Sequence, residues 1–312
     1  YKKIITLKKS IIFPGQGAQY AGMGHDLYQH YAEAREVYQE VDEALKYNLS
    51  NIIFNDSNGE INLTSNTQPA IMATGVAIFR VLKSLHKINL TDFDFCAGHS
   101  LGEYTALVCS EALSLKEASI LLRARGESMQ LAVKSGEGAM AAILGADIVE
   151  IDQIINEGSY ESVEISNDNC PGQIVISGKK LEVESCANDV KNKIGKKSIF
   201  LPVSAPFHCK LMTPASNRMR DLIISSNLKL PKIPIISNVI ANQVNEVVKI
   251  KELLIEQIYK RVRWREIIEF MLKNSVKSFT EIGPGKSLSG MLKRFKQDIL
   301  VKSYNDLADT QN

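Results

Sequence analysis

The serine at the centre of residues 98–102 (Gly98-His99-Ser100-Leu101-Gly102) has the surroundings that most favour covalent chemistry. An apolar run at 93–97 predicts a short buried strand before it, and residues 103–108 predict the first turns of a helix after it. In a G-x-S-x-G pattern, a sharp turn between strand and helix exposes the serine hydroxyl, and the flanking glycines allow that turn. We therefore predict that Ser100 is a nucleophile.

A serine hydroxyl needs a base within hydrogen-bond reach, and histidine is the usual one near neutral pH. His99 adjoins Ser100, but neighbours in a tight turn point apart, so His99 is better suited to packing or to fixing the loop. His208 lies in a proline-containing loop at 203–209, and its position after the serine matches the chain order of α/β hydrolases. We predict His208 as the base, the alternative being a solvated loop histidine. The remaining histidines have polar or lysine-rich neighbours typical of the surface: His25, His30 and His86.

An acyl-transfer site also needs N–H donors directed at the negative charge that develops on the carbonyl oxygen. In folds with this turn, one donor follows the nucleophile and another comes from a loop after an early strand. Residues 8–13 predict such a strand, and Gln16 lies in the glycine-containing loop behind it. We predict that the backbone N–H groups of Leu101 and Gln16 form an oxyanion hole. The alternative for this loop is a tight turn that binds nothing.

Arg125 and Met129 lie one turn apart on a helix predicted at 115–133. A guanidinium can hold a carboxylate through two parallel N–H bonds, so an arginine beside Ser100 would favour an acidic acyl group. Arg125 and Met129 are therefore candidate substrate-binding residues. Spacing alone favours the alternative, a solvated or salt-bridged surface arginine.

Composition excludes several classes of function. The 312 residues are 45% hydrophobic and 23% charged, enough for a large core and a smaller second unit. A formal net charge of +2 provides no general attraction for nucleic acid, and no apolar run approaches the ~18 residues of a membrane span. The five cysteines include no C-x-x-C pair, which argues against a disulfide framework or a zinc site and indicates a reducing compartment.

The predicted elements divide the chain into two α/β domains that would frame a cleft. Residues 137–203 have the strand-helix-strand-strand-helix-strand order of ferredoxin-like folds, and residues 1–136 and 204–312 would form the larger domain. A polar stretch from 303 to 312 predicts a free tail. In the smaller domain, elements are predicted at 139–144, 148–156, 162–167, 173–177, 180–194 and 198–203. In the larger one, they are predicted at 8–13, 68–85, 93–97, 103–108, 115–133, 233–237, from about 251, 264–273, 278–282 and after 285.

Six blocks in order along the chain resemble the malonyl-CoA:acyl carrier protein transacylase family. The resemblance implies a larger α/β-hydrolase-like domain with a parallel sheet, and an inserted ferredoxin-like smaller domain. One departure is the charged run at 260–263 before Trp264, where many relatives carry Asn-Pro-Val. The blocks lie at residues 13–19, 98–104, 125–126, 169–178, 206–208 and 282–286.

The same resemblance implies ping-pong transfer of malonyl from malonyl-CoA to the phosphopantetheine thiol of acyl carrier protein, for fatty acid biosynthesis. Ser100 would be acylated, His208 would act as base and then acid, and Arg125 would grip the malonyl carboxylate. The backbone carbonyl of Gln257 would orient the histidine in place of a triad carboxylate. Phe207 matches a bulky residue of members that select unbranched malonyl.

We expect no metal or cofactor, no nucleic-acid or membrane partner, and a monomer. The expected compartment is a bacterial cytoplasm, or a plastid or apicoplast if a targeting peptide was removed. The main rival is a serine hydrolase or thioesterase acting on acyl-CoA. A non-catalytic carrier-binding module and an excised unit of a larger synthase are further alternatives, and a free tail favours a stand-alone protein. A basic surface for an acidic carrier helix is predicted at Lys191, Lys193, Lys196, Lys197 and Lys210.

Overall fold

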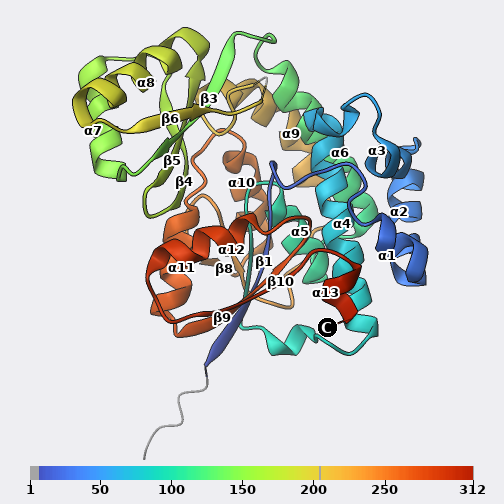
Figure 1. The fold of residues 1–312 in the computed structure, drawn as a ribbon. Coiled ribbons are helices and arrows are strands. Elements are labelled where there is room, and N and C mark those ends of the chain that lie inside the picture. The colour runs from blue at the N-terminus through green and yellow to red at the C-terminus, as the bar shows by residue number, and fades with distance from the viewer. Residues whose placement is uncertain (1–6, 204, 312) are drawn as a thin grey trace, which may run out of the picture.

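The computed structural model describes residues 7–203 and 205–311, which form two lobes (Figure 1). The large lobe (residues 7–137, 201–203 and 205–311) is built on a six-stranded mixed sheet with the order β10-β9-β1-β2-β7-β8. All neighbouring pairs are parallel except β7 and β8, which are antiparallel. The strands are β1 (Lys8–Phe13), β2 (Phe95–Gly98), β7 (Ile235–Ile236), β8 (Gln243–Val244), β9 (Val276–Ile282) and β10 (Leu300–Tyr304).

Helices cover both faces of this sheet. Side chains alternate between the faces of a strand, and in β1 Ile11 and Phe13 join one core cluster while Ile12 joins another. The first cluster includes side chains of α1 (His25–His30), α2 (Ala32–Leu45), α3 (Leu49–Asn55), α4 (Thr64–Ser84), α5 (Gly102–Cys109), α6 (Leu115–Leu131), α9 (Thr213–Ser225) and α10 (Val247–Gln257). The second includes side chains of α11 (Trp264–Lys273) and α12 (Ser287–Leu292).

The small lobe (residues 138–200) is a four-stranded antiparallel sheet with the order β4-β5-β3-β6. One sheet face packs on two helices, because Ala141 and Ile143 share a cluster with helix side chains. Met140 and Ala142, on the opposite face, join the core of the large lobe instead, so this face is turned toward it. The elements are β3 (Gly138–Leu144), α7 (Ile148–Gly158), β4 (Glu164–Cys170), β5 (Gln173–Lys179), α8 (Lys180–Ile194) and β6 (Lys197–Phe200).

Residues 260–265 connect the two lobes through hydrogen bonds and an ion pair. The backbone N–H of Val262 donates to the carbonyl of Ser166 at 2.8 Å, and the N–H of Asp168 donates back to Val262 at 3.0 Å. Beside them, Arg265 and the buried carboxylate of Asp168 form an ion pair at 2.8 Å. Backbone hydrogen bonds and an ion pair therefore join the small lobe to the large one.

The element order predicted for residues 139–203 agrees with the structure, but several bounds shift. The strand predicted at 162–167 runs from Glu164 to Cys170, the strand predicted at 198–203 ends at Phe200, and the helix predicted from 68 begins at Thr64. Within the described residues, the free tail predicted at 303–312 is wrong, because Leu300–Tyr304 pair with β9 and α13 (Leu307–Gln311) contacts α4. Unpredicted elements are α1 to α3, α9, β8, β10, α13 and the short 3₁₀ helices Glu60–Asn62, Leu90–Asp92, Lys210–Met212 and Lys293–Phe295.

Candidate active site

Ser100 occupies the predicted sharp turn between β2 and α5. Its backbone is left-handed, with φ at 53°, a conformation that costs energy in a non-glycine residue and that its surroundings must enforce. A Cβ at Gly98 would lie 1.8 Å from the carbonyl oxygen of Gly102, and a Cβ at Gly102 would lie 2.4 Å from that of Phe13. The two glycines therefore let the chain close tightly enough to present the serine.

His208 meets Ser100 across the fold. Its Nε2 lies 2.7 Å from Ser100 Oγ, and its Nδ1 lies 2.7 Å from the backbone oxygen of Gln257. A carbonyl oxygen can only accept, so Nδ1 carries the proton and Nε2 is left to accept from the serine hydroxyl. Burial, and then the nearby charge of Arg125, lower the pKa of His208 to about 3, so the ring is neutral and ready to act as a base.

The two predicted oxyanion donors line one cavity with the nucleophile. Leu101 and Gln16 both contribute to its wall, and neither backbone N–H donates a hydrogen bond within the described part of the chain. The loop of Gln16 packs closely on the serine turn, because a Cβ at Gly15 would lie 2.5 Å from the carbonyl oxygen of His99. Both N–H groups are therefore available to a ligand beside Ser100.

Arg125 is 1% exposed and points at the nucleophile, which excludes the surface alternative. Its Nη2 lies 3.2 Å from Ser100 Oγ and 2.9 Å from Gln257 Oε1, while its Nη1 donates to Gln68 at 2.7 Å. Within the described residues, Nε has no hydrogen-bond partner and the guanidinium forms no ion pair. Met129 lies on the cavity wall beside it and accepts a hydrogen bond from Gln68 at 3.6 Å. The arrangement offers a buried positive charge to a small anion.

Two further polar residues, missed by the sequence interpretation, hold the serine turn. Asn238 accepts from the Ser100 N–H at 2.7 Å and donates to the Gly98 carbonyl at 2.7 Å. Glu103 accepts from the Gln257 amide at 2.6 Å, and that amide also donates to the Ser100 carbonyl at 3.0 Å. Asn238 follows the carboxyl end of a parallel strand, and site residues are common at such ends. This position is the one sequence signal that could have identified Asn238.

The cavity has a volume of about 520 Å³ and lies between the lobes. The apolar face of the small sheet forms part of its wall, together with Phe207, which is 6% exposed. Gln257 is the one predicted site residue outside this lining, and it acts from behind His208 and Arg125. The predicted residues that do line the cavity are Gln16, Ser100, Leu101, Arg125, Met129, Phe207 and His208.

His99 has the loop-fixing role predicted for it. Its Nε2 lies 2.8 Å from Asn169 Oδ1 in the small lobe, and its ring packs at 5.5 Å from Trp264. Burial lowers the pKa of His99, so it contributes no charge to the site. Two of the three basic residues in the run at 260–263 form local ion pairs, Lys260 with Glu256 and Arg263 with Glu266.

The five lysines that were predicted to form one basic surface lie in different places. Lys191, Lys196 and Lys197 line a second cavity of about 560 Å³ on the small lobe, away from Ser100. Lys193 pairs with Glu157 at 3.0 Å, and Lys210 lies exposed on the large lobe. These five lysines therefore do not form one surface beside the active-site cavity.

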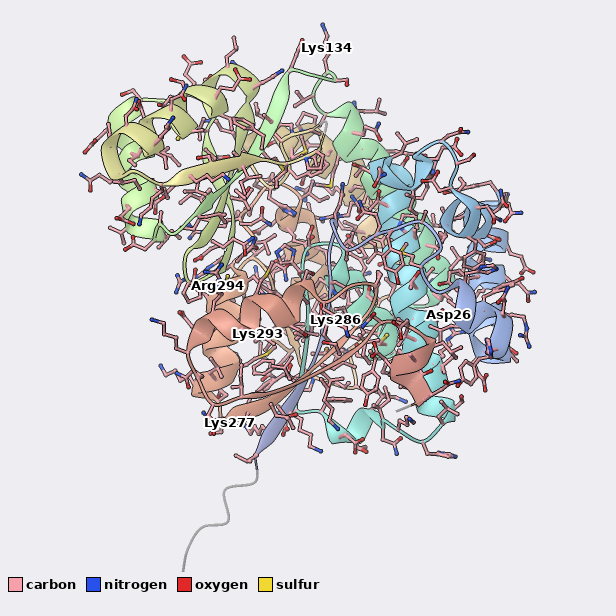
Figure 2. The ribbon with its side chains drawn as sticks, viewed as in Figure 1. Asp26, Lys134, Lys277, Lys286, Lys293 and Arg294 are labelled. Atoms are coloured by element: carbon pink, nitrogen blue, oxygen red, sulfur yellow. The ribbon has the colours of Figure 1, made fainter. Side chains whose placement is uncertain are left out.

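A different set of basic side chains adjoins that cavity. Lys286 directly precedes α12, and Lys293 and Arg294 lie in the 3₁₀ turn that follows it; Figure 2 labels all three around this helix. The same helix supplies Leu288 and Met291 to the cavity wall. Basic side chains thus flank a helix that supplies part of the cavity wall.

In the described ranges 7–203 and 205–311, no cluster of His, Cys, Asp and Glu is arranged to hold a metal ion. None of the helices described there combines the length and the apolar character that a bilayer crossing requires. All five cysteines are buried and free.

Comparison with known proteins agrees with this geometry. The acyl transferase domain family matches residues 11–303. A malonyl CoA-acyl carrier protein transacylase of Bacillus subtilis (strain 168) is 44% identical over 301 residues, 96% of this chain and 94% of the relative.

Solved structures give the same result. An acyl-carrier-protein S-malonyltransferase from Bartonella henselae has 41% identity and a TM-score of 0.94 over 98% of each chain. A malonyl-transacylase in a holo complex with its type II PKS acyl-carrier protein has 36% identity and a TM-score of 0.93, over 97% of this chain and 98% of that one.

Proposed function

Because this chain belongs to the acyl transferase domain family, and within it to the malonyl CoA-acyl carrier protein transacylases, we propose that Ser100 carries the malonyl group between donor and acceptor. The chain transfers malonyl from malonyl-CoA to acyl carrier protein. One observation carries the assignment of roles: Ser100 Oγ lies within hydrogen-bond distance of both His208 Nε2, at 2.7 Å, and Arg125 Nη2, at 3.2 Å. A base and a carboxylate-binding cation on one hydroxyl suit a short acidic acyl group.

In the first half-reaction, Ser100 Oγ attacks the thioester carbonyl and its proton passes to His208 Nε2. The N–H groups of Leu101 and Gln16 stabilise the oxyanion, a contribution of about two to three orders of magnitude in rate per donor. The C–S bond then breaks, and His208 returns the proton to the coenzyme A sulfur. The product is a malonyl ester on Ser100.

In the second half-reaction, the phosphopantetheine thiol of the carrier gives its proton to His208 and attacks the ester. The C–O bond breaks, and Ser100 recovers the proton. Arg125 holds the malonyl carboxylate throughout, which positions the carbonyl against the two N–H donors. The residues present supply every proton and charge that acyl transfer needs, so we propose that no cofactor takes part.

Phe207 is proposed to set selectivity for unbranched malonyl. Its ring is buried in the cavity wall directly before His208, where a substituent on the malonyl methylene would meet it. Discrimination by one methyl group is worth only about 1–3 kcal/mol, so the selectivity is partial.

We also propose the finer architecture, an α/β-hydrolase-like large lobe with an inserted ferredoxin-like small lobe over residues 137–203. The strand-turn-helix presentation of Ser100 supports the first part, and the element order of residues 138–200 supports the second.

The basic residues that flank α12 are proposed to attract the anionic partners. Both coenzyme A and an acidic carrier helix would approach the cavity past Lys286, Lys293 and Arg294. Steep loss of carrier affinity with added salt would support this role, and indifference to salt would contradict it.

Because one chain supplies the nucleophile, base, donors and clamp, we propose that a monomer is active. Bacterial relatives and buried free cysteines support a cytoplasmic or organellar compartment and a place in fatty acid synthesis.

Transfer is distinguished from hydrolysis by following labelled malonyl-CoA with and without holo acyl carrier protein. We expect label on the carrier when it is present, and coenzyme A release limited to one equivalent per chain when it is absent. Continuous release of free malonate, unaffected by the carrier, would instead identify a thioesterase. Matched reactions with carrier lacking its phosphopantetheine group control for non-specific labelling.

A further inference from the structure

Arg125 is a buried cation whose closest link to a carboxylate is indirect. Gln257 lies between Arg125 and Glu103: its Oε1 accepts from Arg125 Nη2 at 2.9 Å, and its Nε2 donates to Glu103 Oε2 at 2.6 Å. Glu103 is 2% exposed and also accepts from the backbone N–H of Asn238 at 3.3 Å. One amide side chain therefore couples the cation of the acyl site to a buried carboxyl group.

The other titratable groups near this pair are uncharged near neutral pH. Tyr104 on α5 and Cys96 on β2 have pKa values raised by burial, Tyr104 to about 12. The pKa of His208 is lowered to about 3. Burial, opposed by the hydrogen bonds from Gln257 and Asn238 and by the charge of Arg125, raises the pKa of Glu103 to about 7.

Malonyl brings a second carboxylate to the same guanidinium. Two carboxylates that share one buried cation cannot both remain ionised at low cost, and one of them takes up a proton. The malonyl carboxylate is held directly by Arg125, whereas Glu103 reaches it only through the Gln257 amide. Glu103 is therefore the group that gives up its charge.

We propose that Glu103 is the resident counter-charge of Arg125, acting through Gln257, and that it is protonated from solvent when the malonyl carboxylate binds Arg125. This inference rests on the proposed function. Ionised Glu103, malonyl-CoA and one proton give malonyl-Ser100, protonated Glu103 and coenzyme A as the free thiol. Acetyl transfer brings no second carboxylate and takes up no such proton.

Selectivity then depends on pH. Above its pKa, Glu103 is ionised and competes with the malonyl carboxylate for Arg125; below it, Glu103 is neutral and the competition is absent. We expect the ratio of kcat/KM for malonyl-CoA to that for acetyl-CoA to fall by about tenfold per pH unit as the pH rises above 7. In Glu103→Gln the side chain still offers an oxygen to Gln257 and Asn238 but has no charge to titrate, so the ratio stays level.

The direct test is proton uptake during malonylation in weakly buffered solution with a pH indicator, with acetylation as the reference. At about pH 8 we expect close to one extra proton per chain for malonyl relative to acetyl, and almost none at about pH 6. Glu103→Gln abolishes the difference. Glu127→Gln, the same exchange at an exposed, ion-paired position on the helix of Arg125, keeps it.

Malonylation without extra proton uptake in the wild-type chain would overturn the proposal, as would an unchanged pH slope in a folded Glu103→Gln. If Glu103→Gln does not fold, proton uptake by the wild-type chain decides alone. A wild-type chain that acquires no malonyl group at all would overturn the proposed function instead, so the two failures are distinct.

Discussion

Ser100 and His208 both adopt left-handed backbone conformations, with φ at 53° and 56°, and from these positions Ser100 Oγ and His208 Nε2 meet at 2.7 Å. The two strained residues are 108 positions apart in the sequence, and the contact between their side chains is the one across which the proton is transferred. Strain of this kind persists only where the surrounding structure enforces it. Here Asn238 binds the serine N–H, and Gln257 binds both the serine carbonyl and the histidine ring.

The low pKa of His208 predicts an unusual pH profile. Because the pKa is about 3, the ring stays neutral and remains a base on the acid side of neutrality. We expect the rate of acylation by acetyl-CoA, which brings no second carboxylate to Arg125, to stay constant between about pH 8 and about pH 5, where an ordinary histidine would become protonated. His208→Ala should lower that rate by about two to four orders of magnitude. A fall in rate centred near the ordinary histidine pKa would contradict the account.

Arg125→Gln removes the positive charge that the malonyl carboxylate needs. We expect the malonyl-to-acetyl ratio of kcat/KM to fall by roughly 10- to 100-fold, as for loss of a hydrogen bond to a charged group. Arg123→Gln, two residues earlier on the same helix, is the matched control, since Arg123 binds Tyr47 and Asn66 outside the cavity. Equal ratios in both variants would exclude the carboxylate clamp.

Asn238→Ala leaves the Ser100 N–H and the Gly98 carbonyl unsatisfied inside the protein. Each buried group without a partner costs about 1–3 kcal/mol, so the free energy of unfolding should fall by that order. Acylation by malonyl-CoA and by acetyl-CoA should slow together, because the variant disturbs the nucleophile and not the clamp. Denaturant unfolding and both acylation rates test this, with Asn245→Ala at an exposed position as the control. A change in the ratio of the malonyl-CoA rate to the acetyl-CoA rate, without slowing of both, would show that Asn238 supports the Arg125 clamp rather than the nucleophile.

Phe207→Leu enlarges the cavity beside the malonyl methylene. Relative use of methylmalonyl-CoA over malonyl-CoA should rise, by no more than about 10- to 200-fold, the range for one methyl group in an apolar pocket. Competition between the two thioesters gives the ratio directly. Phe270→Leu, in a ring pair with Phe95 and away from the cavity, should leave it unchanged. A similar rise in both variants would show general loosening rather than selectivity at Phe207.

The serine turn was predictable because its determinants are local. Glycine, serine and glycine within five residues, between a strand and a helix, specify both the backbone path and the exposed hydroxyl. The role of Leu101 as an N–H donor was predictable from the same pattern, because it is the residue after the nucleophile. The roles of Gln257 and Phe207 required the resemblance to a family, since no local pattern marks them.

The supporting roles of Glu103 and Asn238 were not predicted, because they depend on contacts between distant segments. Glu103 accepts from the Gln257 amide across 154 positions, and Asn238 binds the Ser100 N–H across 138. The strand at Leu300–Tyr304 was missed for another reason: it is an edge strand, and edge strands tolerate the polar residues that resemble a tail. The sequence does contain a signal for α2, because its buried side chains follow helical spacing: Ala34, Val37, Tyr38 and Val41.

The central claim, that Ser100 carries the malonyl group, is tested most directly by intact-protein mass spectrometry after brief exposure to malonyl-CoA. The wild-type chain should gain the mass of one malonyl group and lose it again on addition of holo acyl carrier protein. Ser100→Ala, with an unchanged melting temperature, should gain none. A malonyl adduct of equal stoichiometry on Ser100→Ala would contradict the account.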